Sequence, residues 1–532
     1  MKMENSRKVL VIGLDGETFR VIKPLLAQGK LPNINRLIDK GVHGILMSTI
    51  PPVTAPAWST FMTGKNPGRH GVFSFMRYEY ANGRAVPYDS DTGYPVNGAA
   101  IRSKTIWEII SEAGKHIISI NIPMTYPPRK VNGLMISCFF TPPKARDYTF
   151  PEGLINELGD YEIDVDFGDG FGQFGRLDIK SFDAEKVVPS FLRVLEKREE
   201  TALRLMQSHP WDLFAVCFTE TDRLHHLLWK YIDPASPDYS DGLSARIREK
   251  HDFFYQRLDN AIGRLVDSAG EDVVTVILSD HGFRETPKKF CLLNQWLYGE
   301  GFLKIIDDKC VRIDFESSGA WAEPLLVGTV GIRINMDHFI TKEGEVKTVE
   351  YEVFRSLIIQ LLIKLPDTET GDRIIKEIRR REEIYKGEYT SLSPDIIVTL
   401  NPAYDFPLVM TTGIKGNLLT LPVGNRLICG THEAEGIYIF SGYPVLHHEG
   451  LFTTYSIADI SPTLLYLLDI AVPDDMDGRV LSGALDEEFI QTHPAKYRQS
   501  EPQEFQHSET VTLCEKDVDS IKQRLRNLGY IE

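Results

Sequence analysis

The chain has 532 residues, of which 42% are hydrophobic and 10% aromatic, so wholesale disorder is excluded. Its 59 Lys and Arg residues against 75 Asp and Glu residues give a formal net charge of −16 at pH 7. This acidic balance argues against an obligate nucleic-acid partner or a surface that binds anionic membranes, whereas a small phosphorylated molecule can still bind beside metal ions.

The first apolar run, Val9 to Leu14, follows a short charged lead and ends at Asp15. This run is too short for the hydrophobic region of a signal peptide, and no stretch approaches the length of a membrane-spanning helix. The six cysteines are scattered without a CxxC pair, which is typical of reduced thiols that are mostly buried. We therefore expect a soluble, cytoplasmic protein with no membrane partner.

Strand-like runs alternate with helical patterns along the chain. KVLVIGLDG predicts a buried first strand, and a helix from about Thr105, ended by Gly114, leads to a strand that runs into Pro123. Two further helix–strand units end in strands over 213–218 and 273–278, and GIYIFSG and ADISPTLLYLLDI predict a last strand and helix. This alternation predicts an α/β fold with a mostly parallel central sheet and helices on both of its faces.

Stretches outside the alternation suggest the domain boundaries. We assign residues 5–285 and 425–482 to the α/β core, with an insertion at 141–190 that is rich in Asp, Gly and Phe. Residues 286–424 have strand and helix patterns of their own and predict an inserted cap region that selects the substrate. Residues 483–532 are polar and charged, and predict an appended tail with a terminal helix.

Side chains that bind metals follow the ends of three predicted strands: Asp15, Asp222, His226, Asp280 and His281. Because the carboxyl ends of parallel strands meet at one edge of a sheet, we expect these side chains to converge. Asp222 and His226 are four residues apart and share one face of a helix, whereas His225 points elsewhere and is expected to be packed or solvated. Gly282 lets the chain bend so that Asp280 and His281 both turn inward.

The stretch PPVTAPAWSTFMTG supplies a candidate nucleophile, Thr54. Thr54 lies between Pro51-Pro52 and Pro56, which stiffen the backbone around its hydroxyl. A Thr hydroxyl becomes a competent nucleophile when a metal ion binds its alkoxide. The same stretch contains three rival hydroxyls, those of Ser59, Thr60 and Thr63.

The chain resembles the alkaline phosphatase superfamily, and within it the type I phosphodiesterase/nucleotide pyrophosphatase group. Five motifs carry the resemblance, in the same order: LDGETF, PPVTAPAWSTFMTGKNPGRHGV, TDRLHH, SDHGF and GTHEAEGIYIFSG. The resemblance implies a metal-dependent hydrolase of phosphodiester bonds, with nucleotide pyrophosphates as one candidate substrate class. The cap region and the 141–190 insertion lie outside the resemblance, so the sequence leaves the substrate open.

The resemblance further implies two divalent metal ions and the residues that hold them. One ion would be bound by Asp15, Asp280, His281 and the Thr54 oxygen, and the other by Asp222, His226 and His432. His432 is assigned by the resemblance alone. Such Asp and His sets suit zinc best, and also suit manganese, iron or cobalt. The two ions would clamp the attacking and leaving oxygens while Thr54 forms a phospho-threonine intermediate.

One position departs from the pattern of the group. Nucleotide pyrophosphatases place an Asn downstream of the nucleophile to hold a phosphate oxygen, whereas HGVFSFMRY has Phe75 in this region. Arg69, Arg77 and Arg223 are the candidates for binding a phosphate oxygen instead. The alternatives are a phosphomonoesterase or phosphate-transferring mutase on the same metals, and a catalytically silent protein that binds a phosphorylated ligand.

Overall fold

The centre of the structure, a computed structural model, is a nine-stranded sheet with the strand order β22-β2-β21-β11-β1-β10-β7-β8-β9. The residues described are 7–77, 80–81, 84–85, 94–142, 145–165, 184–240, 242–306, 312–341, 344–407, 414, 417–421, 428–447, 452–500 and 518–522. The strands of the sheet are β1 (Lys8–Leu14), β2 (Gly41–Met47), β7 (Ile117–Ile120), β8 (Gly133–Ile136), β9 (Thr149–Phe150), β10 (Leu213–Phe218), β11 (Val273–Leu278), β21 (Glu435–Ser441) and β22 (Phe452–Ser456).

Most neighbouring strands of this sheet are parallel. β21 runs antiparallel to β2 and β11, and β9 runs antiparallel to β8. The pairs β22–β2, β11–β1, β1–β10, β10–β7 and β7–β8 are all parallel. The prediction of a mostly parallel sheet is therefore confirmed. The alternation of strand and helix patterns in the sequence did not indicate that β21 runs in the opposite direction.

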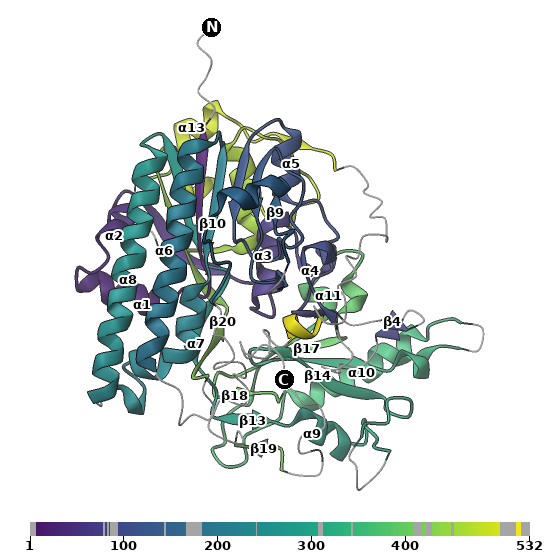
Figure 1. Cartoon of the computed structure of the whole chain (residues 1–532). Coiled ribbons are helices and arrows are strands. Elements are labelled where there is room, and N and C mark those ends of the chain that lie inside the picture. Colours follow the sequence, from purple (N-terminus) through teal and green to yellow (C-terminus); the bar gives the residue numbers. More distant parts are fainter. Residues whose placement is uncertain are drawn as a thin grey trace.

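Helices cover both faces of the sheet, as predicted (Figure 1). Alternate side chains of β1 enter two different hydrophobic clusters, Val9 and Val11 on one face and Leu10 and Ile12 on the other. The first face packs against α3 (Thr54–Thr63), α5 (Ile106–Glu112) and α12 (Ile460–Leu467). The second packs against α1 (Phe19–Ala27), α2 (Pro32–Asp39), α6 (Ala184–Ser208), α7 (Glu220–Ile232) and α8 (Gly242–Ala269).

The predicted cap region, 286–424, contains sheets and a hydrophobic cluster of its own. An antiparallel sheet has the order β14-β15-β17-β16, formed by β14 (Ala320–Leu326), β15 (Thr329–Ile334), β17 (Ile396–Leu400) and β16 (Ile375–Arg380). A smaller sheet joins β18 (Tyr404–Asp405), β13 (Lys289–Cys291) and β19 (Leu419–Thr420). The helices of this region are α9 (Leu293–Gly299), α10 (Thr348–Leu362) and the short α11 (Arg381–Ile384).

Shorter elements connect and extend the core. The helix α4 (Pro67–His70) follows α3, and the stretch after it carries the short strands β3 (Met76–Arg77), β4 (Tyr80–Ala81), β5 (Arg84–Ala85) and β6 (Tyr94–Pro95). In the tail, α13 (Glu487–Thr492) precedes β24 (Tyr497–Arg498), which pairs with β23 (Val472–Pro473). Residues 518–522 of the predicted terminal helix are helical, and 523–532 lie outside the described residues.

The polarity of the helices and the state of the cysteines are two further features of the described residues. Within the described ranges, every helix is either too short or too polar to cross a membrane. Cys138, Cys217, Cys291 and Cys429 are free and buried, as the scattered spacing predicted. Cys310 and Cys514 lie outside the described residues.

Candidate active site

The ends of three neighbouring strands place the predicted ligands at one edge of the sheet. Asp15 follows β1, Asp222 lies in the first turn of α7 after β10, and Asp280 follows β11. β1 pairs with both β10 and β11, so these three carboxylates come together although up to 265 positions separate them in the sequence. All three are at most 1% exposed.

A short antiparallel ladder delivers the one predicted ligand that spacing did not indicate. β12 (Gly282–Glu285) pairs with β20 (Gly430–Glu433), and the register places Phe283 opposite His432. This pairing joins the segment just after His281 to a segment about 150 residues later. His432, which follows the cap region in the sequence, is thereby brought into the site.

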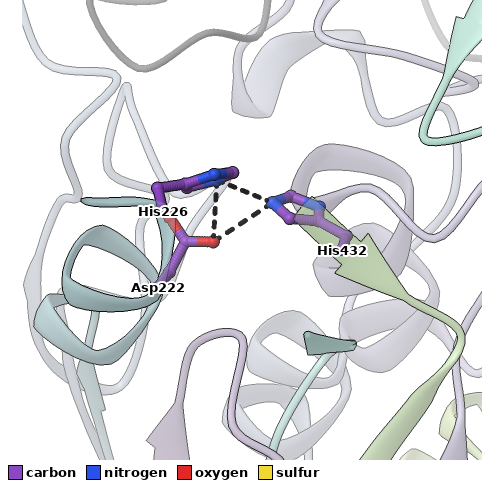
Figure 2. Close-up of side chains that lie close together, drawn as sticks. All are labelled: Asp222, His226 and His432. Atoms are coloured by element: carbon purple, nitrogen blue, oxygen red, sulfur yellow. Dashed lines mark hydrogen bonds and ion pairs between the residues drawn. The ribbon is translucent and has the colours of Figure 1, made fainter. Parts of the chain in front are cut away.

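Asp222, His226 and His432 form the first of two groups that could hold a metal ion (Figure 2). Asp222 Oδ1 lies 3.5 Å from His226 Nε2 and 3.2 Å from His432 Nε2, and the two Nε2 atoms are 3.0 Å apart. His226 Nδ1 donates to Gly430 O at 2.9 Å, and His432 Nδ1 donates to Pro52 O at 3.1 Å. These carbonyls keep the proton on Nδ1, which leaves both Nε2 atoms as lone-pair donors aimed at one point.

Asp15, Asp222 and His281 form the second group. His281 Nε2 lies 3.7 Å from Asp15 Oδ1, 3.9 Å from Asp222 Oδ1 and 3.3 Å from Asp280 Oδ2. The family resemblance assigned Asp222 to one ion only, whereas the structure puts its Oδ1 within reach of both groups. The two groups therefore share the carboxylate of Asp222.

Thr54 lies beside the second group, at the first residue of α3. Its Oγ1 is 3.3 Å from His281 Nε2, and its side chain is buried. The rival hydroxyls are buried inside the same helix and engaged elsewhere: Ser59 donates to Ala55 O, Thr63 donates to Ser59 O, and Thr60 bonds His70. Of the hydroxyls in α3, Thr54 is the one with a described contact to the predicted ligands.

Burial and mutual charge set the protonation of the site. Burial, followed by the charges of neighbouring carboxylates, raises the pKa of Asp15 and of Asp280. Burial also acts to raise the pKa of Asp222, but His226, His432 and Arg223 hold it well below its usual range. Burial lowers the pKa of His226 to about 4 and keeps His281 neutral as well. Neutral imidazoles are the form that binds metal ions.

The buried carboxylate oxygens fit a site for cations. Asp15 Oδ1 and Asp280 Oδ2 are buried and accept no hydrogen bond from the described part of the chain. The second oxygen of each of these carboxylates is held in place, because Trp58 Nε1 donates to Asp15 Oδ2 at 3.2 Å and Gly16 N donates to Asp280 Oδ1 at 3.2 Å. Adjacent carboxylates with uncommitted oxygens repel each other unless a cation lies between them.

The three predicted arginines have different surroundings. Arg223 is 3% exposed, and its Nη1 donates to Asp222 Oδ2 at 2.6 Å while Nη2 lies 3.4 Å from Asp164. Arg69 is paired with Asp477 at 3.0 Å, away from the ligand groups in every contact described for it. The side chain of Arg77 lies outside the described residues. Arg223 is thus the candidate that the fold brings into the site.

The position expected to hold an Asn is apolar in this structure. Phe75 is fully buried, and its ring lies 5.8 Å from that of Phe140. Phe75 belongs to the hydrophobic cluster that α3 and α5 also enter. No amide from this position supports a bound phosphate oxygen.

Sequence reasoning missed several residues that support the ligands. Trp58, which binds Asp15, lies four residues after Thr54 on the same helix, a spacing that could have revealed it. Phe283 packs against the rings of His226 and His432, with centroids 4.7 and 5.2 Å away. No pattern in the sequence indicated that role.

His225 is packed rather than solvated, and it lies outside both ligand groups. Its Nδ1 bonds Gly16 O at 2.9 Å and its Nε2 bonds the Tyr255 hydroxyl at 2.9 Å. Tyr255 donates in turn to Glu17 at 2.8 Å. This buried network ties α7 and α8 to the turn after β1 that carries Asp15.

Comparison with known proteins adds a family and a fold. Residues 9–412 match the family described as type I phosphodiesterase / nucleotide pyrophosphatase. Among solved structures, phosphonoacetate hydrolase from Sinorhizobium meliloti 1021 in complex with phosphonoformate is similar, with a TM-score of 0.53 and 14% identity over 87% of this chain and 95% of that chain. The same enzyme with phosphonoacetate gives a TM-score of 0.50 and 13% identity at the same coverage.

A human protein is also similar. Ectonucleotide pyrophosphatase / phosphodiesterase 5 has a TM-score of 0.47 and 15% identity, over 92% of this chain and 99% of that chain. None of the curated protein sequences is significantly similar to this chain. At 13–14% identity, the two phosphonoacetate hydrolase structures indicate a shared fold.

Proposed function

The chain belongs to the type I phosphodiesterase / nucleotide pyrophosphatase family, and from this premise we propose that it cleaves phosphodiester bonds with Thr54 as nucleophile and two divalent metal ions as cofactors. The family indicated by the motifs is confirmed, and the chain is a phosphoric ester hydrolase. The expectation that the 141–190 insertion and the cap region lie outside the resemblance is wrong, because the match runs through both to residue 412. The proposal that Thr54 is the nucleophile rests on the position of its Oγ1. This atom lies 3.3 Å from His281 Nε2, beside the two groups that could hold metal ions.

The donor atoms suit two metal ions. Asp222, His226 and His432 would hold one ion, and Asp15, Asp280, His281 and the Thr54 oxygen would hold the other. Carboxylates and neutral imidazoles without thiolates suit zinc best, and also manganese, iron or cobalt. When bound, two such ions supply Lewis-acid stabilisation of the attacking and leaving oxygens.

The residues of the chain orient the reaction. Thr54 Oγ1, having lost its proton, attacks phosphorus, so that an O–P bond to Thr54 forms as the bond to the leaving alcohol oxygen breaks. Water then hydrolyses the bond between Thr54 and phosphorus, which releases a phosphate monoester and restores the Thr54 hydroxyl. The first turn of α3 leaves backbone N–H groups without helical acceptors, and these favour a phosphate oxygen beside Thr54. Trp58 fixes one oxygen of Asp15, and Arg223 fixes one oxygen of Asp222. The other oxygen of each carboxylate is thereby held in a single orientation.

A second candidate activity is a phosphomonoesterase or phosphate-transferring mutase on the same site. The buried Phe75 favours it, since the amide that would help to hold a diester phosphate oxygen is missing. A small phosphorylated molecule is the substrate in either case. We also propose a cytoplasmic location, supported by the four free, buried cysteines of the described residues.

The test is a substrate panel on purified protein of measured metal content. A nitrophenyl phosphodiester, a nitrophenyl phosphomonoester and phosphonoacetate, the ligand of the structurally similar hydrolase, are assayed side by side before and after chelation. We expect the diester to be hydrolysed fastest, activity to vanish on chelation, and zinc or manganese to restore it. Faster monoester hydrolysis would favour the second candidate, and full activity in verified metal-free protein would overturn both.

A further inference from the structure

A segment of the cap region packs against the stretch that leads to Thr54. Tyr385, just after α11, is 1% exposed, and its hydroxyl donates a hydrogen bond to Ile50 O. Its ring meets that of Phe73 edge to face, with centroids 5.1 Å apart. Figure 1 shows α11 beside α4, at the boundary between the core and the cap region. Residues more than 330 positions apart in the chain are therefore in direct contact.

Hydrogen bonds to backbone atoms of residues 386 and 389 fix this junction next to Tyr385. Asn66 Nδ2 donates to Lys386 O and Lys386 N donates to Asn66 Oδ1, both at 3.0 Å. Tyr389 N donates to Gly68 O at 2.8 Å. Gly387 has no room for a side chain, because a Cβ there would lie 2.6 Å from Gly68 O. The segment 385–389 is thus fitted to α4 and is not a loosely attached loop.

The carbonyls that precede Thr54 are held one after another. Ile50 O accepts from the Tyr385 hydroxyl, Pro51 O accepts from Thr49 Oγ1 at 2.7 Å, and Pro52 O accepts from His432 Nδ1 at 3.1 Å. The two prolines have no N–H, so their carbonyls are the only backbone polar groups by which they can be fixed. The cap region thereby holds one end of the segment whose other end is held by a predicted metal ligand.

We propose that Tyr385 is a positioning residue for Thr54, so that the cap region helps to place the nucleophile. The proposal rests on Thr54 being the nucleophile. Tyr385 is buried behind the segment, so it acts on Thr54 through Ile50 without touching the substrate. A displacement of about 1 Å at a reacting group lowers a rate by roughly 100-fold, so a small shift of this segment has a large effect on turnover.

The test compares Tyr385→Phe with Tyr389→Phe. The first variant keeps the ring that packs on Phe73 and removes the hydroxyl that binds Ile50 O. The second removes, from the same segment, a hydroxyl that has no hydrogen bond to the described residues, while its ring still lies near Arg102. We expect Tyr385→Phe to lower kcat by about 10- to 100-fold with KM and metal content unchanged, and Tyr389→Phe to leave kcat within about 2-fold.

A second readout does not depend on turnover. Hydrogen–deuterium exchange of the Val53 and Thr54 amides in metal-free protein should accelerate at least about 5-fold in Tyr385→Phe and stay unchanged in Tyr389→Phe. Equal kcat and equal exchange in both variants would overturn the proposal, as would a loss of kcat explained wholly by lost metal or unfolding. If wild-type protein lacks phosphoesterase activity, the proposed function fails, and exchange alone decides whether Tyr385 fixes the segment.

Discussion

The buried carboxylates at the ligand edge of the core differ from Glu323 and Asp367 of the cap region in how their oxygens are bonded. In the cap region, both oxygens of Glu323 accept hydrogen bonds from Arg333, at 3.2 and 2.7 Å, and Asp367 accepts from Tyr404 and Lys289, at 2.7 and 2.9 Å. In the core, Asp15 and Asp280 each have an oxygen that accepts no hydrogen bond among the described residues. Satisfied carboxylates stabilise a fold, whereas clustered and uncommitted ones are arranged for a cation or a substrate.

Trp58 shows how the core keeps this arrangement rigid. The indole N–H holds one oxygen of Asp15 and leaves the other directed toward His281. Because Trp58 and Thr54 lie one turn apart on α3, the same helix places both the proposed nucleophile and the support of a predicted ligand. The cap region, in contrast, reaches the site through backbone contacts at Ile50 and Gly68.

The largest expected effect separates two hydroxyls of the core helix α3. Thr54→Ala removes the attacking oxygen and leaves the Asp and His ligands in place, so turnover should fall on the order of 10⁴-fold or more while the protein stays folded. Thr54→Ser should retain partial activity because the oxygen survives. Steady-state kinetics with metal analysis and circular dichroism check these outcomes.

Ser59→Ala is the matched control for Thr54→Ala. Its hydroxyl only returns a hydrogen bond to Ala55 O within the helix, so we expect near-normal turnover and a stability change of about 1 kcal/mol or less. Normal turnover in Thr54→Ala with loss in Ser59→Ala would assign the wrong hydroxyl. If both variants were fully active, a water molecule would be the attacking group and the covalent step would be removed.

The next prediction sets a core carboxylate against one from the cap region. Asp222→Asn removes the negative charge from the side chain whose Oδ1 both ligand groups share, which makes it a weaker metal ligand. Both ions should therefore be lost, and activity should fall with them. Asp367→Asn should keep full metal content and instead lower the free energy of unfolding by about 1–3 kcal/mol, because the Lys289 pairing is broken. Metal analysis and urea unfolding of the two variants give the comparison.

If Asp367→Asn lost metal, the inference that Asp367 stabilises the fold without affecting metal binding would be wrong. Loss of one ion only in Asp222→Asn would show that the second group is completed by Asp280, in agreement with the assignment from the family resemblance. Retention of both ions would remove Asp222 from the ligand set. Each result changes the comparison between the two regions at a named residue.

The part of the site that the sequence predicted follows from local rules. Buried strands such as β1 and β11 are continuous apolar runs, and the polar residues that follow them must lie at the sheet edge. The strands β2, β8 and β22 were not predicted, and β2 contains two glycines, which weaken a strand pattern.

The remaining features depend on contacts between distant segments. His432 reaches the site because β20 pairs with β12, and Tyr385 reaches Ile50 because the cap region folds back onto α4. Neither contact leaves a periodic signal in the sequence around it. Family resemblance located His432, and only the structure located Tyr385.

The last prediction concerns acid stability and His70, a buried imidazole of the core at the end of α4. Val72 N donates to its Nδ1 at 3.2 Å, so Nε2 carries the proton that faces Thr60 Oγ1 at 3.0 Å. Burial, with the nearby charge of Lys65, lowers the pKa of His70 to about 3 from the ordinary value of 6.5. Protonation of Nδ1 would also break the bond from Val72.

The sign of the pH dependence follows from these values. Between pH 6.5 and 3 the unfolded chain binds a proton at His70 that the folded chain excludes, so this contribution to stability is complete above pH 6.5 and is lost as the pH falls. The slope approaches about 1.4 kcal/mol per pH unit. His70→Gln keeps an acceptor for Val72 and a donor for Thr60 but does not titrate. Urea unfolding at pH 7.5, 6.5 and 5.5 should therefore give a steeper decline for wild type than for His70→Gln, and parallel declines would show that His70 titrates normally in the folded core.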